Sequence, residues 1–271
     1  MKPGVCCVVV LVVLCGMAGT PRAVGAPVLP DFGAATFVPG APIDNPRRPW
    51  VPDTLYTYEG EIDDEGEIIL EHVEVLVTRD TKMVAGIPCT VVRDRVWEDS
   101  VLMEDTFDWY AQDTDGNVWY MGEFSTEYEY DDEGNVVGLN HDGSWEAGVD
   151  GAQPGYLMEA NPLVGDSYYQ EFYPGEAEDE AEVISLDEVV AIALGSFGHC
   201  LQTSETTALE PDVQEYKYYA PGVGLVLVEE LDEEGEPDFV SELVSVETVP
   251  EPASLSLLLL GVAALARRRR R

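Results

Sequence analysis

The chain is poor in positive charge. It contains 14 Lys and Arg residues against 53 Asp and Glu residues, which gives a formal net charge of −39 at pH 7. Half of the basic residues lie near the two ends, so that residues 27–249 carry seven basic and 52 acidic side chains and a net charge of −45. Such a surface repels nucleic acid, anionic polysaccharide and anionic lipid headgroups unless cations intervene. Nucleic acid is therefore not an expected partner.

Signatures of catalysis are also missing. The three histidines, His72, His141 and His199, show no metal-ligand spacing, and the sequence has no G-x-S-x-G motif and no phosphate-binding glycine loop. The segment Asp113–Asn117 lacks the preceding ligand of a calcium loop, because Ala111 occupies that place. The sequence predicts no catalytic residue, metal site or cofactor, and a protein that is not an enzyme. A hydrolase stays an alternative, since 52 carboxylates can form an acid pair by chance.

The first 26 residues have the composition of a secretory signal peptide. Lys2 supplies the positive start, Val5–Cys15 is an apolar run, and small residues follow near Ala26. A lipoprotein modified at Cys15 is the alternative, but Leu14 is larger than that signal normally tolerates. The sequence therefore predicts export with removal of residues 1–26.

The last 22 residues combine three signals in a fixed order. Pro250, Glu251 and Pro252 precede the uncharged segment Ala253–Ala266, and a block of arginines follows, namely Arg267, Arg268, Arg269, Arg270 and Arg271. As a helix, fourteen residues cover roughly 21 Å, less than the ~30 Å hydrocarbon core of a bilayer. Thinning of the bilayer and snorkelling arginines can close that gap. The arginines favour the cytoplasmic side, which places residues 27–249 outside the membrane.

This order resembles the PEP-CTERM sorting signal of exported bacterial proteins. The resemblance implies that an exosortase reads and cuts residues 250–271, after transient anchoring in the membrane through the C-terminal helix. It implies a location at the cell surface or in the extracellular matrix. A plain C-terminal anchor that is never cut is the alternative.

Cysteine is scarce once the leader is removed. Only Cys89 and Cys200 remain in residues 27–249. An even pair in an exported protein predicts one disulfide. The alternative is a Cys200 nucleophile beside His199, which is disfavoured because adjacent residues on a strand point to opposite faces.

The remaining chain divides into an arm and a β-domain. Prolines recur through residues 27–49, which predicts an extended arm or linker whose end is fixed by Trp50. Residues 50–249 show period-two alternation and four turn motifs that end in glycine. The turns are Asp63–Gly66, Asp113–Gly116, Asp131–Gly134 and Asp232–Gly235. Glycine supplies the positive φ of a tight hairpin. We therefore expect one all-β domain, an antiparallel meander that forms a curved sheet or half-open barrel.

Two body segments support this architecture by resemblance. Thr106–Asp113 with Gly116–Glu123, and Tyr218–Val226, resemble motifs of uncharacterised secreted bacterial proteins. Some of these are similar to curved antiparallel half-barrels of the lipoprotein-carrier type. The resemblance implies a half-open barrel and supplies no active site.

Aromatic side chains are concentrated on one predicted hairpin. Trp109, Tyr110, Trp119 and Tyr120 lie on its two arms and are expected to face one another across it. On an open face they would form a platform for an apolar or glycan ligand, whereas packing in the core is the alternative. The sequence thus leaves two hypotheses: a structural or interaction module of the cell surface, which contacts exopolysaccharide or cations, and a binding module with an aromatic-lined concave sheet.

Overall fold

The computed structural model describes residues 26–64, 66–232 and 234–249. Nearly all of the predicted signal peptide and the whole predicted sorting and anchor segment, residues 250–271, lie outside these residues. Among the residues described, none forms a helix that is both long and apolar enough to cross a membrane.

The described part of the chain consists of sixteen strands and one short 3-10 helix, η1 (Phe32–Ala34). All strand pairs are antiparallel, which confirms the predicted all-β class. The strands are β1 (Thr54–Asp64), β2 (Glu67–Val84), β3 (Ile87–Glu98), β4 (Val101–Gln112), β5 (Val118–Phe124), β6 (Glu127–Tyr130), β7 (Val136–Asn140), β8 (Trp145–Glu146), β9 (Gln153–Met158), β10 (Ser167–Tyr169), β11 (Glu171–Phe172), β12 (Asp179–Ile192), β13 (Gly195–Thr207), β14 (Gln214–Ala220), β15 (Gly224–Leu231) and β16 (Pro237–Thr248).

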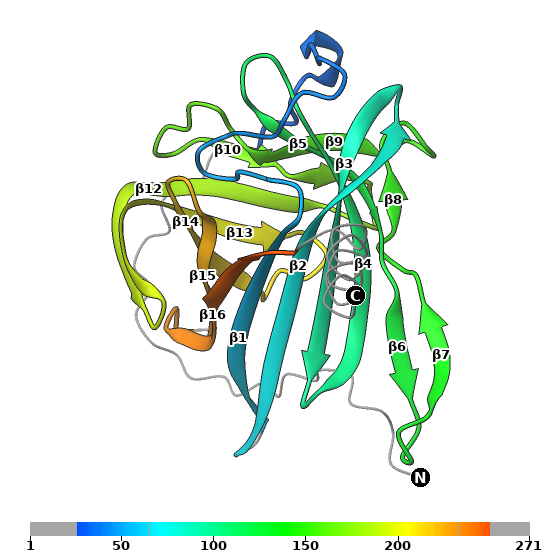
Figure 1. The fold of residues 1–271 in the computed structure, drawn as a ribbon, viewed down its shortest axis with the longest axis vertical. Helices are drawn as coiled ribbons and strands as arrows, with labels where there is room; N and C mark the ends of the chain where they lie inside the picture. Colours follow the sequence, from blue (N-terminus) through cyan, green and yellow to red (C-terminus); the bar gives the residue numbers. More distant parts are fainter. Residues whose placement is uncertain (1–25, 65, 233, 250–271) are drawn as a thin grey trace, which may run out of the picture.

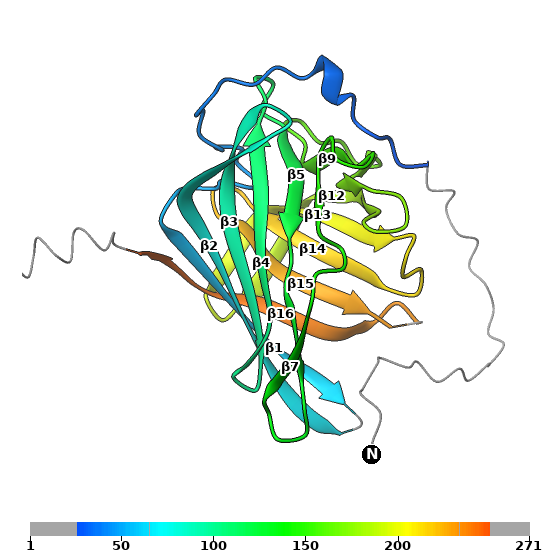
Figure 2. The same ribbon diagram turned by 90° about the vertical axis from the view of Figure 1, so that its right-hand side faces the viewer.

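The strands curl into a nearly closed barrel (Figure 1). Their order in the sheet is β10-β12-β13-β14-β15-β16-β1-β2-β3-β4-β5-β9-β11. The two strands at the ends of this order, β10 and β11, follow each other in the chain and are separated only by Gln170, whose N–H donates to the carbonyl of Asp179 at 2.8 Å. One short segment therefore joins the first and last strands, and the barrel closes further than the predicted half-open form. A ribbon formed by β6 and β7 projects from one end of the barrel (Figure 2).

The four predicted turns are all hairpins. They join β1 to β2, β4 to β5, β6 to β7 and β15 to β16. Their glycines have φ between 78° and 96°, as the turn type requires. The aspartate that begins each turn also stabilises it. The Asp113 carboxylate accepts hydrogen bonds from the backbone N–H groups of Asp115 and Asn117, both at 2.9 Å. Asp131 and Asp232 accept from their own turns in the same way.

Alternation along the strands separates two apolar clusters. Val92 and Tyr110 belong to the cluster that fills the barrel, to which strands from all sides contribute. Their chain neighbours Val91 and Trp109 belong to a second cluster on the outer face of β3, β4 and β5. Successive residues of a strand point to opposite faces, so one sheet supplies both cores.

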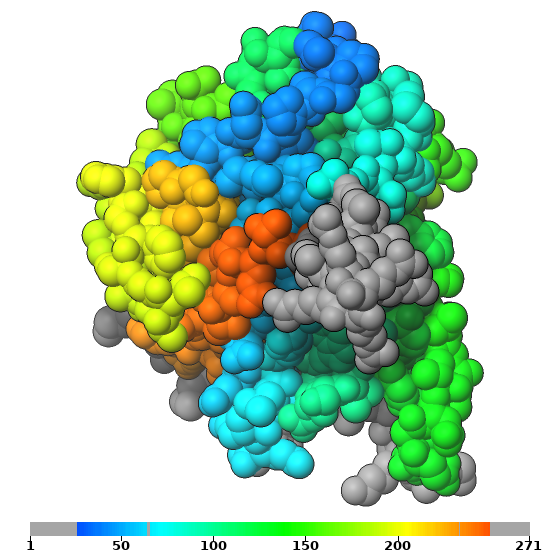
Figure 3. All heavy atoms as spheres, in the orientation of Figure 1, coloured from blue at the N-terminus to red at the C-terminus, as the bar shows by residue number. Residues whose placement is uncertain are grey.

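The predicted arm packs along the barrel as extended chain with isolated bridges (blue in Figure 3). Phe32 and Phe37 cover Trp119 on the outer face, with ring centroids 5.4 and 6.1 Å from its own. Asn45 is buried and its amide donates to carbonyl groups of two loops. Trp50 is also buried in the barrel core, as predicted. The arm is therefore part of the folded structure.

The predicted Cys89–Cys200 disulfide is not formed, and both cysteines are buried free thiols. Cys89 on β3 belongs to the outer cluster, whereas Cys200 on β13 belongs to the cluster inside the barrel. Strands β3 and β13 are also separated by five strands in the sheet. A disulfide needs Cα atoms about 4.4–6.8 Å apart, which two residues on opposite faces of separated strands cannot reach.

Candidate functional site

Two neighbouring cavities in the barrel share part of their lining. The outer one has a volume of about 350 Å³ and reaches the exposed residues Leu209 and Glu210 of the β13–β14 loop. The inner one has a volume of about 160 Å³ and is lined by Tyr110, Tyr120 and Tyr219. Four ionisable residues line both cavities, namely Glu171, Asp179, Glu205 and Lys217. We call the pair of cavities the barrel cavity.

Lys217 on β14 is paired with two carboxylates. Its Nζ lies 2.9 Å from a carboxylate oxygen of Glu205 and 2.9 Å from one of Glu215. Glu205 also accepts hydrogen bonds from the hydroxyl groups of Thr203 and Tyr219, at 2.8 and 3.0 Å. Burial alone would raise the pKa of Glu205, but Lys217 and these donors outweigh it and lower the pKa. Glu205 and Lys217 are therefore both charged.

At the other carboxyl groups of the cavity, hydrogen bonds and, at Asp179, the charge of Lys217 offset the effect of burial only in part. Burial is the main cause that raises the pKa of Glu123, Glu171 and Asp179, and mutual repulsion adds to it at Glu123 and Glu171. The Tyr120 hydroxyl oxygen lies 2.6 Å from Asp108 and 2.7 Å from Glu123. A tyrosine hydroxyl has one proton and can donate to only one of the two carboxyl groups. The other carboxyl group must therefore carry a proton of its own to form a hydrogen bond with the tyrosine oxygen. These carboxyl groups consequently retain protons at pH values where exposed carboxyl groups are ionised.

Arg48 enters the inner cavity from the arm. Its guanidinium carbon lies 4.2 Å from the ring centroid of Trp50 and 5.6 Å from that of Tyr219. Within the residues that the structure describes, Nε of Arg48 has no hydrogen-bond partner, and none of the ion pairs found there involves Arg48. The inner cavity thus contains a cation that is held by aromatic faces and by the neighbouring Tyr58 hydroxyl, without a paired carboxylate.

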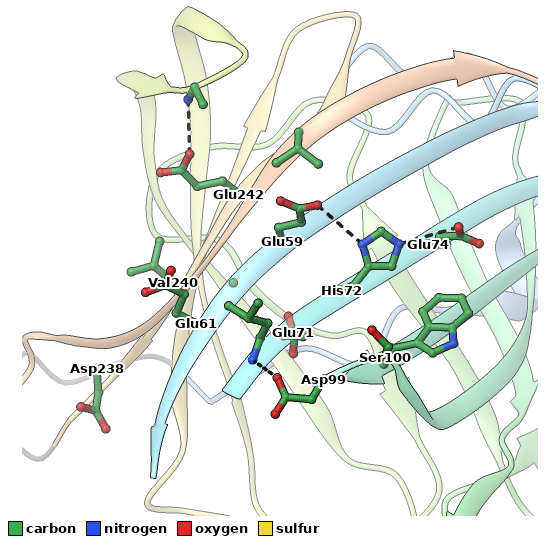
Figure 4. A pocket seen from close by; sticks show the side chains of 15 residues that line it. Glu59, Glu61, Glu71, His72, Glu74, Asp99, Ser100, Asp238, Val240 and Glu242 are labelled. Carbon is green, nitrogen blue, oxygen red and sulfur yellow. Dashed lines mark hydrogen bonds and ion pairs between the residues drawn. The ribbon is translucent and has the colours of Figure 1, made fainter. Parts of the chain in front are cut away.

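A larger groove of about 1040 Å³ lies on the outer face of β16, β1, β2 and β3 (Figure 4). His72 is central to it, 3.8 Å from Glu59 and 3.7 Å from Glu74. The ring centroids of His72 and Trp97 lie 5.5 Å apart. Other carboxylates lining the groove come from Glu61, Glu71, Asp99, Asp238 and Glu242. The outer groove therefore combines a pair of aromatic rings with many hydrogen-bond acceptors.

The four predicted ligand-facing aromatic residues are divided between the outer cluster and the barrel interior. Trp109 and Trp119 lie in the outer cluster, where Lys82 Nζ sits 3.3 Å from the Trp109 ring centroid and Trp119 is fully buried. Tyr110 and Tyr120 pair across β4 and β5, stack at 4.8 Å and line the inner cavity. The structure thus divides the predicted set, with the two tyrosines at a cavity and the two tryptophans in packing.

The three histidines lie on separate elements of the structure. They lie on β2, in the β7–β8 loop and on β13, and the described residues contain no group of three or more His, Cys, Asp or Glu side chains that could hold a metal ion. Sequence reasoning missed Arg48 and Lys217. Their rarity is the signal that could have found them, because only seven basic residues lie in residues 27–249. Both are partly buried in the structure, and a basic side chain that leaves the surface of so acidic a chain needs a reason.

These features define a nearly closed antiparallel β-barrel with a polar internal cavity. Residues 248–271 match the PEP-CTERM protein-sorting motif. The motif indicates an exported protein that an exosortase sorts. It confirms the resemblance of Pro250, Glu251, Pro252 and the arginine block to that signal.

Two solved structures are similar to the chain. A protein from Bacteroides fragilis, described as exported and as having a YmcC-like fold, has 14% sequence identity and a TM-score of 0.42, over 79% of this chain and 100% of that one. A protein from Parabacteroides distasonis, described as a lipoprotein, has 14% identity and a TM-score of 0.35, over 74% of this chain and 97% of that one. No match to the chain is found among the curated proteins.

Proposed function

We propose that the protein is an exosortase-processed component of the cell surface or extracellular matrix and acts as a non-enzymatic structural or interaction module. The observation that carries this proposal is the position of the sorting motif. The last strand, β16, ends at Thr248, and the motif begins at the same residue. The barrel is thus complete before the tail starts, and cutting the tail releases an intact folded module.

The outer groove supports an interaction role. It presents carboxylates that accept hydrogen bonds from hydroxyl groups and attract cations, together with the rings of His72 and Trp97. Direct contact with an anionic polymer is opposed by the net charge of −45 on residues 27–249. Exopolysaccharide would therefore bind through neutral sugars or through bridging cations.

The test is the intact mass and location of the protein in its own host, with and without replacement of Pro250, Glu251 and Pro252 by alanine. We expect the wild-type protein to leave the membrane without its arginine block and the variant to stay in the membrane fraction. If both remain in the membrane with Arg271 intact, the protein is a plain anchored surface domain and the proposal fails.

A second candidate function is a binding module. The barrel cavity favours it, because Tyr110 and Tyr120 of the predicted aromatic set line that cavity. The charged residues beside them make a purely apolar ligand a poor fit. The ligand of such a module would therefore be polar.

A further inference from the structure

The inner cavity holds a cation, Arg48, beside two carboxyl groups, Glu171 and Asp179, whose pKa values burial raises. Lys217 is matched by Glu205 and Glu215, at 2.9 Å each. Arg48 forms no ion pair among the described residues, although its charge acts to lower the pKa values of the buried Asp94 and Asp108 carboxyl groups. Glu171 and Asp179 line the same cavity, and Lys217 acts to lower the pKa of Asp179 without forming an ion pair with it in the described part of the chain. Buried charges without a partner are costly. A ligand carboxylate would pair with Arg48, and a ligand ammonium group would stabilise the ionised forms of Glu171 and Asp179.

We propose that the barrel cavity binds a small zwitterion of the amino-acid class, with its carboxylate on Arg48 and its ammonium group against Glu171 and Asp179. This inference rests on the second candidate function, the binding module, and specifies its ligand. The inner cavity, at about 160 Å³, is smaller than the roughly 300–1,000 Å³ of sites for drug-sized ligands, so its ligand must be compact.

The entrance favours a zwitterion over a simple anion. Glu176 and Glu210 line the outer cavity, which shares Glu171, Asp179, Glu205 and Lys217 with the inner one. A free carboxylate compound is repelled there, whereas a zwitterion has no net charge. A simple diamine passes the entrance but leaves Arg48 without a partner. A molecule with both groups has no net charge to be repelled by the outer cavity and also gives Arg48 a partner.

Aromatic side chains give the site a rigid frame. Tyr110 and Tyr120 stack at 4.8 Å, and the Arg48 guanidinium lies over Trp50 at 4.2 Å. The Trp145 indole N–H donates to Glu171, which fixes that carboxyl group. The charged groups are therefore held before a ligand arrives, which reduces the entropy that binding costs.

Binding should also release protons. Burial raises the pKa of the Glu171 and Asp179 carboxyl groups in the empty cavity. An ammonium group stabilises their ionised forms, so the carboxyl groups lose protons when the ligand binds. The heat of binding therefore depends on the ionisation enthalpy of the buffer, which a surface contact between charged groups would not produce.

The test is calorimetric titration of the exported protein, purified from its producing cells, with matched compounds. The zwitterions run from glycine through 4-aminobutyrate to 6-aminohexanoate, and the comparison set is 1,4-diaminobutane, succinate and 1,4-butanediol. We expect at least one zwitterion to bind about tenfold or more tightly than the three others, with proton release. Equal or tighter binding of diaminobutane or succinate, or no binding of any compound, overturns the proposal.

Two variants test which residues bind the ammonium and carboxylate ends of the ligand. Asp179→Asn and Arg48→Lys each change one charged contact with little change in volume, and each is expected to weaken zwitterion binding about tenfold or more. Asp238→Asn, in the outer groove, is the matched control and should bind normally. Unchanged affinity in both cavity variants contradicts the assignment. Thermal unfolding of each variant verifies that the barrel is intact.

Failure of this inference and failure of the sorting proposal have different signatures. A protein that reaches the cell surface without its arginine block but binds no zwitterion overturns only the ligand. A protein that binds the zwitterion but stays in the membrane with Arg271 intact overturns only the sorting.

Discussion

At Glu123 and Asp108, burial raises the pKa to about 8 and about 6, respectively. Both carboxyl groups contact the Tyr120 hydroxyl, and each repels the other. Ionising the pair requires two negative charges in a buried place, which costs free energy. The barrel interior is therefore most stable when these groups carry protons.

Replacing Glu123 with glutamine is expected to flatten the pH dependence of stability. The folded pKa of about 8 exceeds the reference value of 4.5, so between these values the folded protein binds more protons than the unfolded chain. The free energy of unfolding therefore falls as the pH rises through this window, by up to about 1.4 kcal/mol per pH unit for one group. Urea unfolding across the window measures the slope.

The control is Glu133→Gln, which changes an exposed carboxylate of the β6–β7 turn. It should retain the slope of the wild-type protein. If the slope of Glu123→Gln also equals that of the wild-type protein, Glu123 does not keep its proton in the folded barrel.

At the scale of the element, the hairpins share one turn chemistry but differ in burial. Asp113 in the β4–β5 turn is buried and also accepts from the Trp119 indole N–H at 2.8 Å. Among the described residues, Asp131 in the β6–β7 turn accepts only from its own turn. The same sequence motif thus anchors a core tryptophan in one hairpin and a projecting ribbon in the other.

Asp113→Ala is expected to destabilise the protein by about 1–3 kcal/mol more than Asp131→Ala, because it leaves the buried indole N–H of Trp119 without an acceptor. Chemical unfolding of both variants measures the difference, and tryptophan fluorescence reports on Trp119. Equal losses in the two variants would show that the turn amides alone account for the role of Asp113.

At the scale of the whole molecule, closure of the barrel depends on a close approach at the seam. A Cβ atom on Gly155 of β9 would lie 2.0 Å from the carbonyl oxygen of Tyr169 and 2.6 Å from that of Gln170. Both neighbours are backbone atoms of the segment that joins the ends of the sheet. Glycine is therefore required there for space, and its φ lies outside the left-handed region.

Gly155→Ala is expected to open the seam and to lower the free energy of unfolding by about 3 kcal/mol, near the upper end of overpacking costs. The control is Gly198→Ala on β13, where a Cβ atom would meet nothing within 4 Å, and a change within about 0.5 kcal/mol is expected. Hydrogen exchange should show faster exchange in β9 and β12 for Gly155→Ala alone. Protection equal to that of the wild-type protein in those strands would refute this role of Gly155.

The sequence by itself determined the features that depend on neighbouring residues. The Asp-to-Gly turns predicted all four hairpins because φ and the turn hydrogen bonds are local. Period-two alternation predicted strands for the same reason. The sorting signal is a linear motif and needed no fold to be recognised.

Only the tertiary structure decided which residues meet. Cys89 and Cys200 are a plausible pair by count, but the sheet places them in different clusters. Arg48 and Lys217 lie far apart in the chain and line one cavity because the arm and β14 meet inside the barrel. Such contacts depend on the order of strands and on the closure at Gln170, which no local pattern encodes.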